Sequence, residues 1–405
     1  MNRFAKANSD HILALAVFVL LVFGLVMITS IGVPKSIQLS APDILYPNCS
    51  DDNVDCYLLF KNHLVRLGIG VLVLLLCSKI PYTWWRKFSM VFFGFAFLSL
   101  IAVLLLGTSH GTIAKSWISF FSASFQPAEF AKLALILYLA HFFERKSDEV
   151  ATFEYGFIPF TIISSIIILP VLLQPDFGSA IVMMMICVAV YFVAGASKRH
   201  IALGSLIALL LGTIVIYNVP HVQKRFTAFL NPTIECAEDY CWQSEQAKIA
   251  VGTGGVWGRG LAQGIQKSYW LPQATDDFIF AASAEELGFL RTTLIVLAFL
   301  VIGYRGFQIS NHSPNRFALL AATGITAWIL VQAFMNIAIN VGLFPVTGIT
   351  LPFVSYGGSS LVATLAGVGI LLNISKHQTA NAYRFDRRRD RRARHPKRRY
   401  IRRAH

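Results

Sequence analysis

Long runs of apolar residues constrain the fold of this chain more than any other feature of its sequence. Ile12–Ile28 and Ile162–Leu173 contain no charged residue, and their apolar side chains do not alternate with polar ones. A segment that crosses a bilayer needs about 20 mostly apolar residues, and its backbone must be hydrogen-bonded within a helix or a closed barrel. Barrel strands alternate in polarity, which these runs do not. The sequence therefore predicts an all-α polytopic membrane protein.

The composition supports the membrane assignment. Hydrophobic residues make up 55% of the 405 residues, charged residues make up 14%, and the mean hydropathy is +0.59. Soluble domains carry about 25% charged residues, so this apolar surplus needs lipid as its solvent. We expect about ten transmembrane helices, near Ile12–Ser30, Leu64–Ile80, Phe88–Leu106, Pro127–Phe143, Phe157–Leu173, Ser179–Ala194, Ile201–Tyr217, Phe280–Tyr304, Phe317–Val341 and Ser360–Ile374.

Basic residues in the short loops orient the predicted helices. Lys and Arg are enriched on the cytoplasmic side of membrane proteins. Here they occur in alternate short loops, at Arg3, Lys6, Arg86, Lys87, Arg145, Lys146, Lys198, Arg199 and Arg305. These loops share one side with the C-terminal tail only if the number of crossings is even. We therefore predict two cytoplasmic termini, with long outer loops at about 31–62 and, between helices seven and eight, at about 218–277.

The net charge of +14 is concentrated at the end of the chain. The predicted transmembrane domain spans residues 1–374, and the tail 375–405 holds thirteen Lys and Arg residues against two Asp. A polybasic stretch directly after a last membrane helix is attracted to anionic lipid by about 1 kcal/mol per basic residue. We expect a cytoplasmic tail that lies on anionic lipid, in preference to a protein partner, and we predict no nucleic acid as a partner.

Four cysteines form two close pairs in the predicted outer loops. Cys49 and Cys56 share the first long loop, and Cys236 and Cys241 share the second. Close pairs in an oxidising compartment favour two short-loop disulfides, with free thiols as the alternative.

Charged residues inside the predicted helices are the first candidates for a site. Such residues are costly in lipid and face a cavity or a partner. Glu129 and Lys132 lie three residues apart, so they share one helix face and can pair. Asp176 follows Gln174-Pro175 at the outer end of the fifth predicted helix. An ion pair that fixes helix register and a substrate cavity explain Glu129 and Lys132 equally well.

The large outer loop ends in two carboxylates. Asp276 and Asp277 stand directly before the apolar residues that open the eighth predicted helix. Burial and a neighbouring like charge raise the pKa of a carboxyl group, which suits it to act as a general base near neutral pH. Asp is also a favoured helix N-cap, so Asp276 is a candidate cap while Asp277 is the base. The glycines at 252–255 predict that this part of the loop is not helical.

Several segments, in order along the chain, resemble the signatures of the SEDS family, the multi-pass proteins of shape, elongation, division and sporulation. They are Phe125–Leu133 (FQPAEFAKL), Gln174–Ser179 (QPDFGS), Arg225–Pro232 (RFTAFLNP), Leu271–Gly288 (LPQATDDFIFAASAEELG) and Pro345–Ser360 (PVTGITLPFVSYGGSS). The resemblance covers roughly Phe18 to Ile374, and the last signature is a near-complete match.

The resemblance implies an activity, a location and a set of site residues. Family members polymerise lipid II into glycan strands of peptidoglycan at the outer face of the bacterial cytoplasmic membrane. The acceptor's GlcNAc 4-hydroxyl attacks C1 of the donor's MurNAc, and undecaprenyl pyrophosphate leaves with inversion, so a base and positive charge are needed. The matching positions are Asp277 as the base, with Glu129, Lys132, Asp176 and Ser355 around the substrate.

Two departures from the family pattern affect the predicted site. Thr275-Asp276 stand where the family usually has His-Thr, so Asp276 could raise the pKa of the base, bind a cation or share its role. Serines, at Ser116 and Ser124, stand where the family often carries basic residues. The adjacent Lys115 is a candidate to supply the lost positive charge.

The resemblance also implies partners. Division-type, FtsW-like members are favoured over elongation-type, RodA-like ones, and either type works with a class B penicillin-binding protein, the transpeptidase that crosslinks the new strand. A divalent cation would suit a leaving pyrophosphate, but the sequence names no metal ligands. A lipid II flippase and a scaffold are the alternative functions. Carboxylates at one face favour chemistry, since an ion-driven transporter places its charges near the bilayer midplane.

Overall fold

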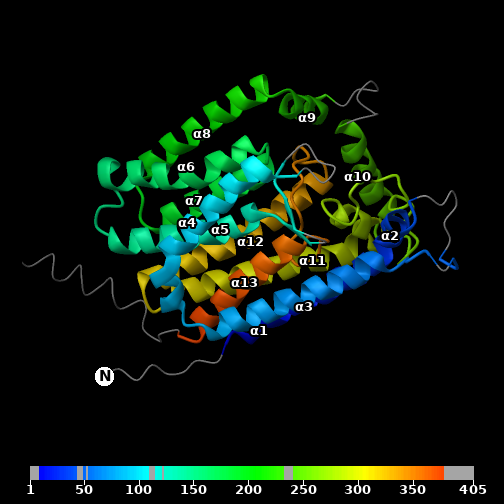
Figure 1. The fold of residues 1–405 in the computed structure, drawn as a ribbon, viewed down its shortest axis with the longest axis horizontal. Helices are drawn as coiled ribbons and strands as arrows, with labels where there is room; N and C mark the ends of the chain where they lie inside the picture. The colour runs from blue at the N-terminus through cyan, green and yellow to red at the C-terminus, as the bar shows by residue number, and fades with distance from the viewer. Residues whose placement is uncertain are drawn as a thin grey trace, which may run out of the picture.

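The computed structural model describes residues 9–42, 49–51, 53–108, 115–120, 123–231 and 240–377. These residues form α-helices, one π-helical turn and a two-stranded antiparallel hairpin (Figure 1). In chain order the elements are α1 (His11–Ile31), α2 (Val33–Ser40), α3 (Leu58–Lys79), α4 (Tyr82–Leu106), β1 (Ile118–Phe120), β2 (Ala123–Phe125), α5 (Pro127–Arg145), η1 (Phe153–Phe157), α6 (Ile158–Leu173), α7 (Phe177–Val193), α8 (Lys198–Asn218), α9 (Pro220–Leu230), α10 (Tyr240–Gly254), α11 (Ile279–Asn311), α12 (Arg316–Asn340) and α13 (Gly358–Ser375).

The all-α membrane prediction is confirmed. Each of the ten predicted segments is a helix, namely α1, α3 to α8 and α11 to α13. Within the described residues, eight helices are long and apolar enough to cross a bilayer. The other two are α7, which has 17 residues, and α5, which carries Glu129, Lys132 and Glu144. Both pack inside the same bundle, where α5 contacts α4 and α12, and α7 contacts α12.

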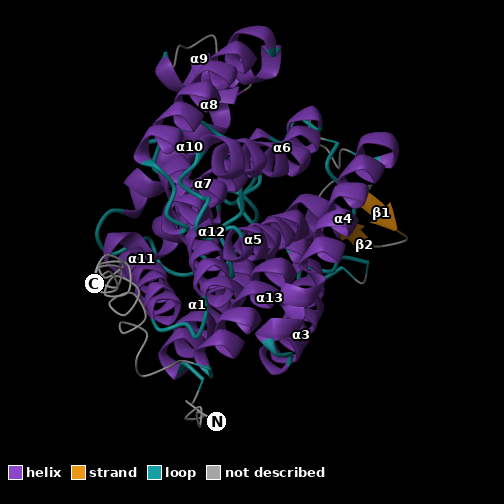
Figure 2. Ribbon diagram, turned by 90° about the vertical axis from the view of Figure 1, so that its left-hand side faces the viewer, coloured by secondary structure: helices purple, strands orange, loops and turns teal. Residues whose placement is uncertain are grey.

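The bundle has an apolar interior and an equally apolar exterior. The helices α12 and α13 lie at its centre (Figure 2), where α12 packs on α5, α7 and α11, and α13 packs on α3. Around them, large apolar side chains point outward, among them Phe95 at 70% exposure and Leu209 at 67%. Apolar surface on this scale is stable only against lipid, because water would disfavour it. The helix α8 has no buried residue at all.

The long connections gather at one end of the bundle. Figure 1 shows α2, α9 and α10 at this end, opposite the end at which α1 begins. The predicted Cys49–Cys56 disulfide is confirmed in the connection after α2. The predicted Cys236–Cys241 pair includes Cys236, which lies outside the described residues.

The prediction that residues 252–255 are not helical is wrong for most of that stretch, because α10 continues to Gly254. The glycine serves a close approach between helices. A Cβ atom at Gly254 would lie 2.0 Å from the main-chain oxygen of Ala284 in α11. Only a residue without a side chain allows α10 to end against α11 in this way.

Candidate active site

Asp277 lies where the large loop enters α11, and its position is fixed through its main chain. Its carbonyl oxygen accepts hydrogen bonds from Asn336 Nδ2 at 2.8 Å and Asn340 Nδ2 at 2.9 Å. Asn340 Oδ1 also accepts from the first turn of α11, from the Ala281 amide at 2.8 Å. The Asp277 side chain is half-buried. The loop end of α12 therefore holds the base candidate while its carboxylate stays accessible.

A ladder of amide side chains on α12 makes these contacts, and sequence reasoning missed it. Gln332, Asn336 and Asn340 are spaced four residues apart, so they share one helix face, and all three are fully buried. Asn336 also donates to the main-chain oxygen of Ile349 at 2.6 Å. Three amides at this spacing in an otherwise apolar helix are costly in lipid unless paired, and that signal could have revealed them.

Asp276 contacts an element that the sequence did not connect to it. Lys35 Nζ of α2 lies 2.5 Å from Asp276 Oδ2, and the Thr275 hydroxyl donates to the same oxygen at 3.0 Å. The prediction that Asp276 caps the eighth helix is wrong. The N-cap of α11 is Phe278, which makes no side-chain cap. An ion pair with Lys35 satisfies the Asp276 carboxylate instead, since its side chain faces α2.

The electrostatic surroundings favour a protonatable Asp277. Burial, and then the Asp276 carboxylate, raise the pKa of Asp277 to about 7, against the opposing effects of Lys35 and Arg225. Asp176 adds a further small increase to this pKa. A carboxyl group that titrates near neutral pH can both take and release a proton there, as a general base must.

Asp176 interacts electrostatically with the intramembrane pair and with Asp277. It is the N-cap of α7, where Oδ1 accepts from the Ser179 amide at 3.0 Å, and Oδ2 accepts from Gln126 Nε2 at 3.2 Å. Burial raises its pKa, while the hydrogen bonds from Ser179 and the charge of Lys132 lower it. The next turn touches the final signature segment, since a Cβ at Gly178 would lie 2.8 Å from the Thr347 main-chain oxygen.

The predicted pairing of Glu129 and Lys132 is confirmed. Lys132 Nζ lies 2.7 Å from Glu129 Oε1, and both side chains are almost fully buried. Lys132 also donates to Gln332 Oε1 at 2.9 Å, which accepts from Trp328 Nε1 at 2.8 Å. Glu129 Oε2 is buried without a protein partner. The pair therefore joins α5 to the amide ladder, and it lies within helix packing in this structure.

Ser355 joins the final signature segment to the backbone next to the proposed base. Its hydroxyl donates to the main-chain oxygen of Asp276 at 2.5 Å and accepts from the Leu351 amide at 2.8 Å. The amide of the next residue, Tyr356, donates to the Thr275 main-chain oxygen at 2.9 Å. Ser355 is 3% exposed, so in this structure it sets the path of the backbone beside Asp277.

Lys115 is exposed and lies at a recess of about 200 Å³. The recess is lined by Lys115, Leu104, Leu173, Gln174 and Pro175. Gln174 and Pro175, which lead directly into Asp176, are part of this lining, and Leu104 and Leu173 are its aliphatic members. A cation beside aliphatic side chains at the loop end of the bundle matches an amphipathic lipid whose head group carries phosphate.

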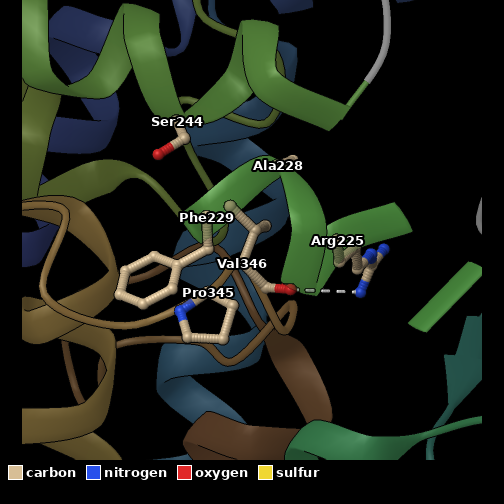
Figure 3. Close-up of a pocket in the computed structure, with 6 residues that line it drawn as sticks. All are labelled: Arg225, Ala228, Phe229, Ser244, Pro345 and Val346. Atoms are coloured by element: carbon tan, nitrogen blue, oxygen red, sulfur yellow. Dashed lines mark hydrogen bonds between the residues drawn. The ribbon is translucent and has the colours of Figure 1, made fainter. Parts of the chain in front are cut away.

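Arg225 of α9 provides a second cation at this end of the bundle. Its Nη1 donates to the main-chain oxygen of Val346 at 3.4 Å (Figure 3). Phe229 and Ser244 line the same small pocket, which lies against Pro345. The contact brings α9 against the final signature segment. The charge of Arg225 lowers the pKa of Asp277 and so opposes the effects of burial and of Asp276.

The two glutamates that follow Asp277 hold the large loop. Glu285 accepts from the main-chain amides of Ile265 and Gln266 at 2.9 and 3.0 Å. Glu286 lies 2.7 Å from Lys267 Nζ and accepts from the Ser30 hydroxyl at 2.7 Å. Both carboxylates are fully buried. They fold the loop over the start of α11 and are not free for chemistry.

No metal ligands emerge from the described part of the chain. There, no group of three His, Cys, Asp or Glu side chains is placed to hold an ion. A divalent cation at the site stays a hypothesis.

The fold and the buried carboxylates define a class: a multi-pass membrane protein with its candidate site at one end of the helix bundle. Comparison with known proteins gives the family. Residues 11–380 match the FtsW/RodA/SpoVE family model, described as "Cell cycle protein". The chain belongs to this family, as the sequence signatures predicted.

Individual relatives and solved structures agree. The chain is 37% identical over 375 residues to stage V sporulation protein E of Bacillus subtilis (strain 168), covering 92% of this chain and 98% of that protein. It is 38% identical over 312 residues to the "Probable peptidoglycan glycosyltransferase FtsW" of Geobacter sulfurreducens, covering 76% and 82%.

Two solved structures share the fold. One belongs to a study of "Structural coordination of polymerization and crosslinking by a peptidoglycan synthase complex", with a TM-score of 0.73 and 27% identity, over 92% of this chain and 99% of that one. The other is the rod shape determining protein RodA of Thermus thermophilus, with a TM-score of 0.66 and 25% identity, over 91% and 97%.

Proposed function

We propose that this protein is a peptidoglycan glycosyltransferase that polymerises lipid II, with Asp277 as the general base. The observation that carries the proposal is the placement of Asp277. Two amides of α12 fix its main chain, its side chain is half-buried at the loop end, and its pKa is raised to about 7. The names of several relatives, among them the FtsW proteins, support the activity.

The chemical step that we propose is the one that the family resemblance implies. The Asp277 carboxylate takes the proton of the acceptor's GlcNAc 4-hydroxyl while its oxygen forms a bond to C1 of the donor's MurNAc. The bond from C1 to the pyrophosphate oxygen breaks, and undecaprenyl pyrophosphate leaves with the bonding electrons, so C1 is inverted. Positive charge lowers the energy of the departing pyrophosphate, and we assign that role to Lys115. Glu129, Lys132, Asp176, Asp276 and Ser355 complete the substrate-binding region.

We also propose the orientation and the partner. The loop end with Asp277 faces the outer side of the bacterial cytoplasmic membrane, and both termini face the cytoplasm, as the basic short loops indicate. The solved synthase complex, whose title joins polymerization with crosslinking, supports a class B penicillin-binding protein as partner. Relatives named FtsW and stage V sporulation protein E support a division-type role. The basic tail, of which residues 378–405 lie outside the described residues, binds anionic lipid.

Glycan polymerisation from labelled lipid II tests the proposal. The purified protein, with its partner transpeptidase present, is compared with Asp277→Asn and Asp276→Asn. We expect wild type to make polymer, Asp277→Asn to make none, and Asp276→Asn to remain active. Asp55→Asn is the matched control, because Asp55 lies at the same end of the bundle and pairs with Lys61 at 2.8 Å.

Other outcomes separate the alternatives. Loss of activity only in Asp276→Asn would assign the general base to Asp276 instead of Asp277. A wild-type protein that makes no polymer with any transpeptidase partner would overturn the enzyme assignment, and transport of lipid II across vesicles would then be measured.

A further inference from the structure

The short helix α2 places one lysine against the carboxylate that neighbours the proposed base. Lys35 Nζ lies 2.5 Å from Asp276 Oδ2 and 3.1 Å from Gln273 Oε1. We propose that Lys35 is a positioning residue for the reaction: it holds the Asp276 carboxylate in place and offsets its charge, so that Asp277 is ionised when the acceptor binds. This inference rests on the proposed role of Asp277.

The helix α2 is fastened on the side that faces the membrane helices. Ser36 is 1% exposed, and its hydroxyl donates to the Gly32 main-chain oxygen at 2.8 Å and accepts from the Leu59 amide of α3 at 3.1 Å. On the loop side, the Tyr269 hydroxyl donates to the Pro34 main-chain oxygen at 3.2 Å. The residues on both sides of Lys35 are therefore anchored, and the lysine is presented to Asp276 from a fixed backbone.

The face of α2 that carries Val33 and Ile37 packs on the disulfide loop. Ala41, Val54 and Cys56 form a small buried apolar cluster, and Val33 and Ile37 of α2 pack against it. The Cys49–Cys56 bridge closes the loop that carries two of these residues. A cluster of this size is separate from the main core, so its task in the fold is to hold α2.

Charge explains why Asp277 needs Lys35. Two adjacent carboxylates disfavour each other's ionisation, which raises the pKa of the more buried one. The other charged groups that act on Asp277 are Asp176, at the start of α7, and Arg225 of α9. Among the described residues, Lys35 is the cation in direct contact with Asp276. Loss of its charge leaves the Asp276 carboxylate uncompensated beside the base.

The pH dependence of lipid II polymerisation tests the proposal. We expect Lys35→Met to move the acid limb of kcat/KM up by about one pH unit, which is about a fivefold loss at pH 7 and little loss at pH 9. Asp276→Asn should move the limb the other way. The double variant should return close to wild type, and Lys35→Arg, which keeps the charge, should leave the limb in place.

A matched control and a substrate-free readout complete the test. Lys61→Met breaks a comparable ion pair, with Asp55, and should leave the limb unmoved. Carbodiimide labelling of protonated Asp277, followed by mass spectrometry against pH, should shift in parallel with the activity limb and needs no lipid II. It tests Lys35 even in a protein that makes no polymer. An equal loss of activity at every pH in Lys35→Met, or an unmoved labelling curve, would overturn the proposal.

Discussion

Asn336 donates from Nδ2 to the main-chain oxygen of Asp277 over 2.8 Å, and so ties the centre of the bundle to the proposed base. The same nitrogen donates to the main-chain oxygen of Ile349 at 2.6 Å. One buried amide therefore sets the distance between the loop that precedes α11 and the final signature segment.

Loss of this amide should reduce turnover more than substrate affinity. Asn336→Leu removes the amide donor to the Ile349 carbonyl and leaves the Asp277 carbonyl with Asn340 as its remaining side-chain donor, so the backbone of Asp277 is held less firmly. A shift of about 1 Å at a reacting group can cost about a hundredfold in rate, so we expect a fall of ten- to a hundredfold in kcat. Polymerisation kinetics measure it, with Asn218→Leu at the exposed end of α8 as the control. A folded Asn336→Leu protein with unchanged kcat would contradict the role given to this amide.

The buried pair on α5 should respond differently to single and double substitution. Lys132→Met leaves Glu129 charged and unpaired, which costs about 3–5 kcal/mol, whereas Lys132→Met with Glu129→Gln should recover much of that stability. Thermal unfolding in detergent measures both. We expect the double variant to be stable but poorly active, because the charges of both residues act on Asp176. A stable and fully active double variant would leave the pair with a purely structural role.

The activity of the wild-type protein should fall on the acid side of neutrality. Burial and the Asp276 carboxylate raise the pKa of Asp277 to about 7. The carboxylate gains its proton as the pH falls through this value and then cannot accept another. We expect kcat/KM to decrease about tenfold per pH unit below 7 and to level off above it. A profile at constant ionic strength checks this, and an acid limb near pH 4 would rule out Asp277 as the titrating group.

Lys115 should affect binding of the donor through its charge. Lys115→Ala removes a cation from the exposed recess beside Gln174 and Pro175, and exposed ion pairs contribute about 0.2–1 kcal/mol. We expect kcat/KM for lipid II to fall about two- to fivefold at low salt, with a smaller difference at high salt. Lys87→Ala is the control. Lys87 lies at the start of α4, whereas Leu104, which lines the recess, lies near the end of α4. Full activity at every salt concentration would exclude Lys115 as the pyrophosphate cation.

Reduction of the Cys49–Cys56 disulfide should loosen α2. The Cys49–Cys56 bridge holds the loop on which Val33 and Ile37 pack, and loops this short contribute on the order of 2 kcal/mol. We expect faster amide hydrogen exchange over 33–40 in Cys49→Ser with Cys56→Ser, while exchange in α12 stays slow. Unchanged exchange in α2 would show that Ser36 and Tyr269 hold the helix without the bridge.

The sequence by itself determined the helices and the candidate residues. Each predicted apolar run is a helix in the structure. Whether a segment can cross a bilayer depends on the hydropathy of that segment alone, which is a local property of the sequence. The pairing of Glu129 and Lys132 was also a local matter, because residues three apart share a helix face. The family signatures then gave Asp277, whose neighbour Asp276 was already visible as a second carboxylate.

Only the tertiary structure decided what those residues touch. Asp276 is an ion-pair partner of Lys35, 241 positions away in the chain, and not a helix cap. Asp277 takes its position from Asn336 and Asn340, and Ser355 bonds to the backbone beside it. Such contacts join distant segments, and they depend on how the helices pack and where the loops fold back. No local pattern encodes that packing, so the residues that tune the base became visible only in three dimensions.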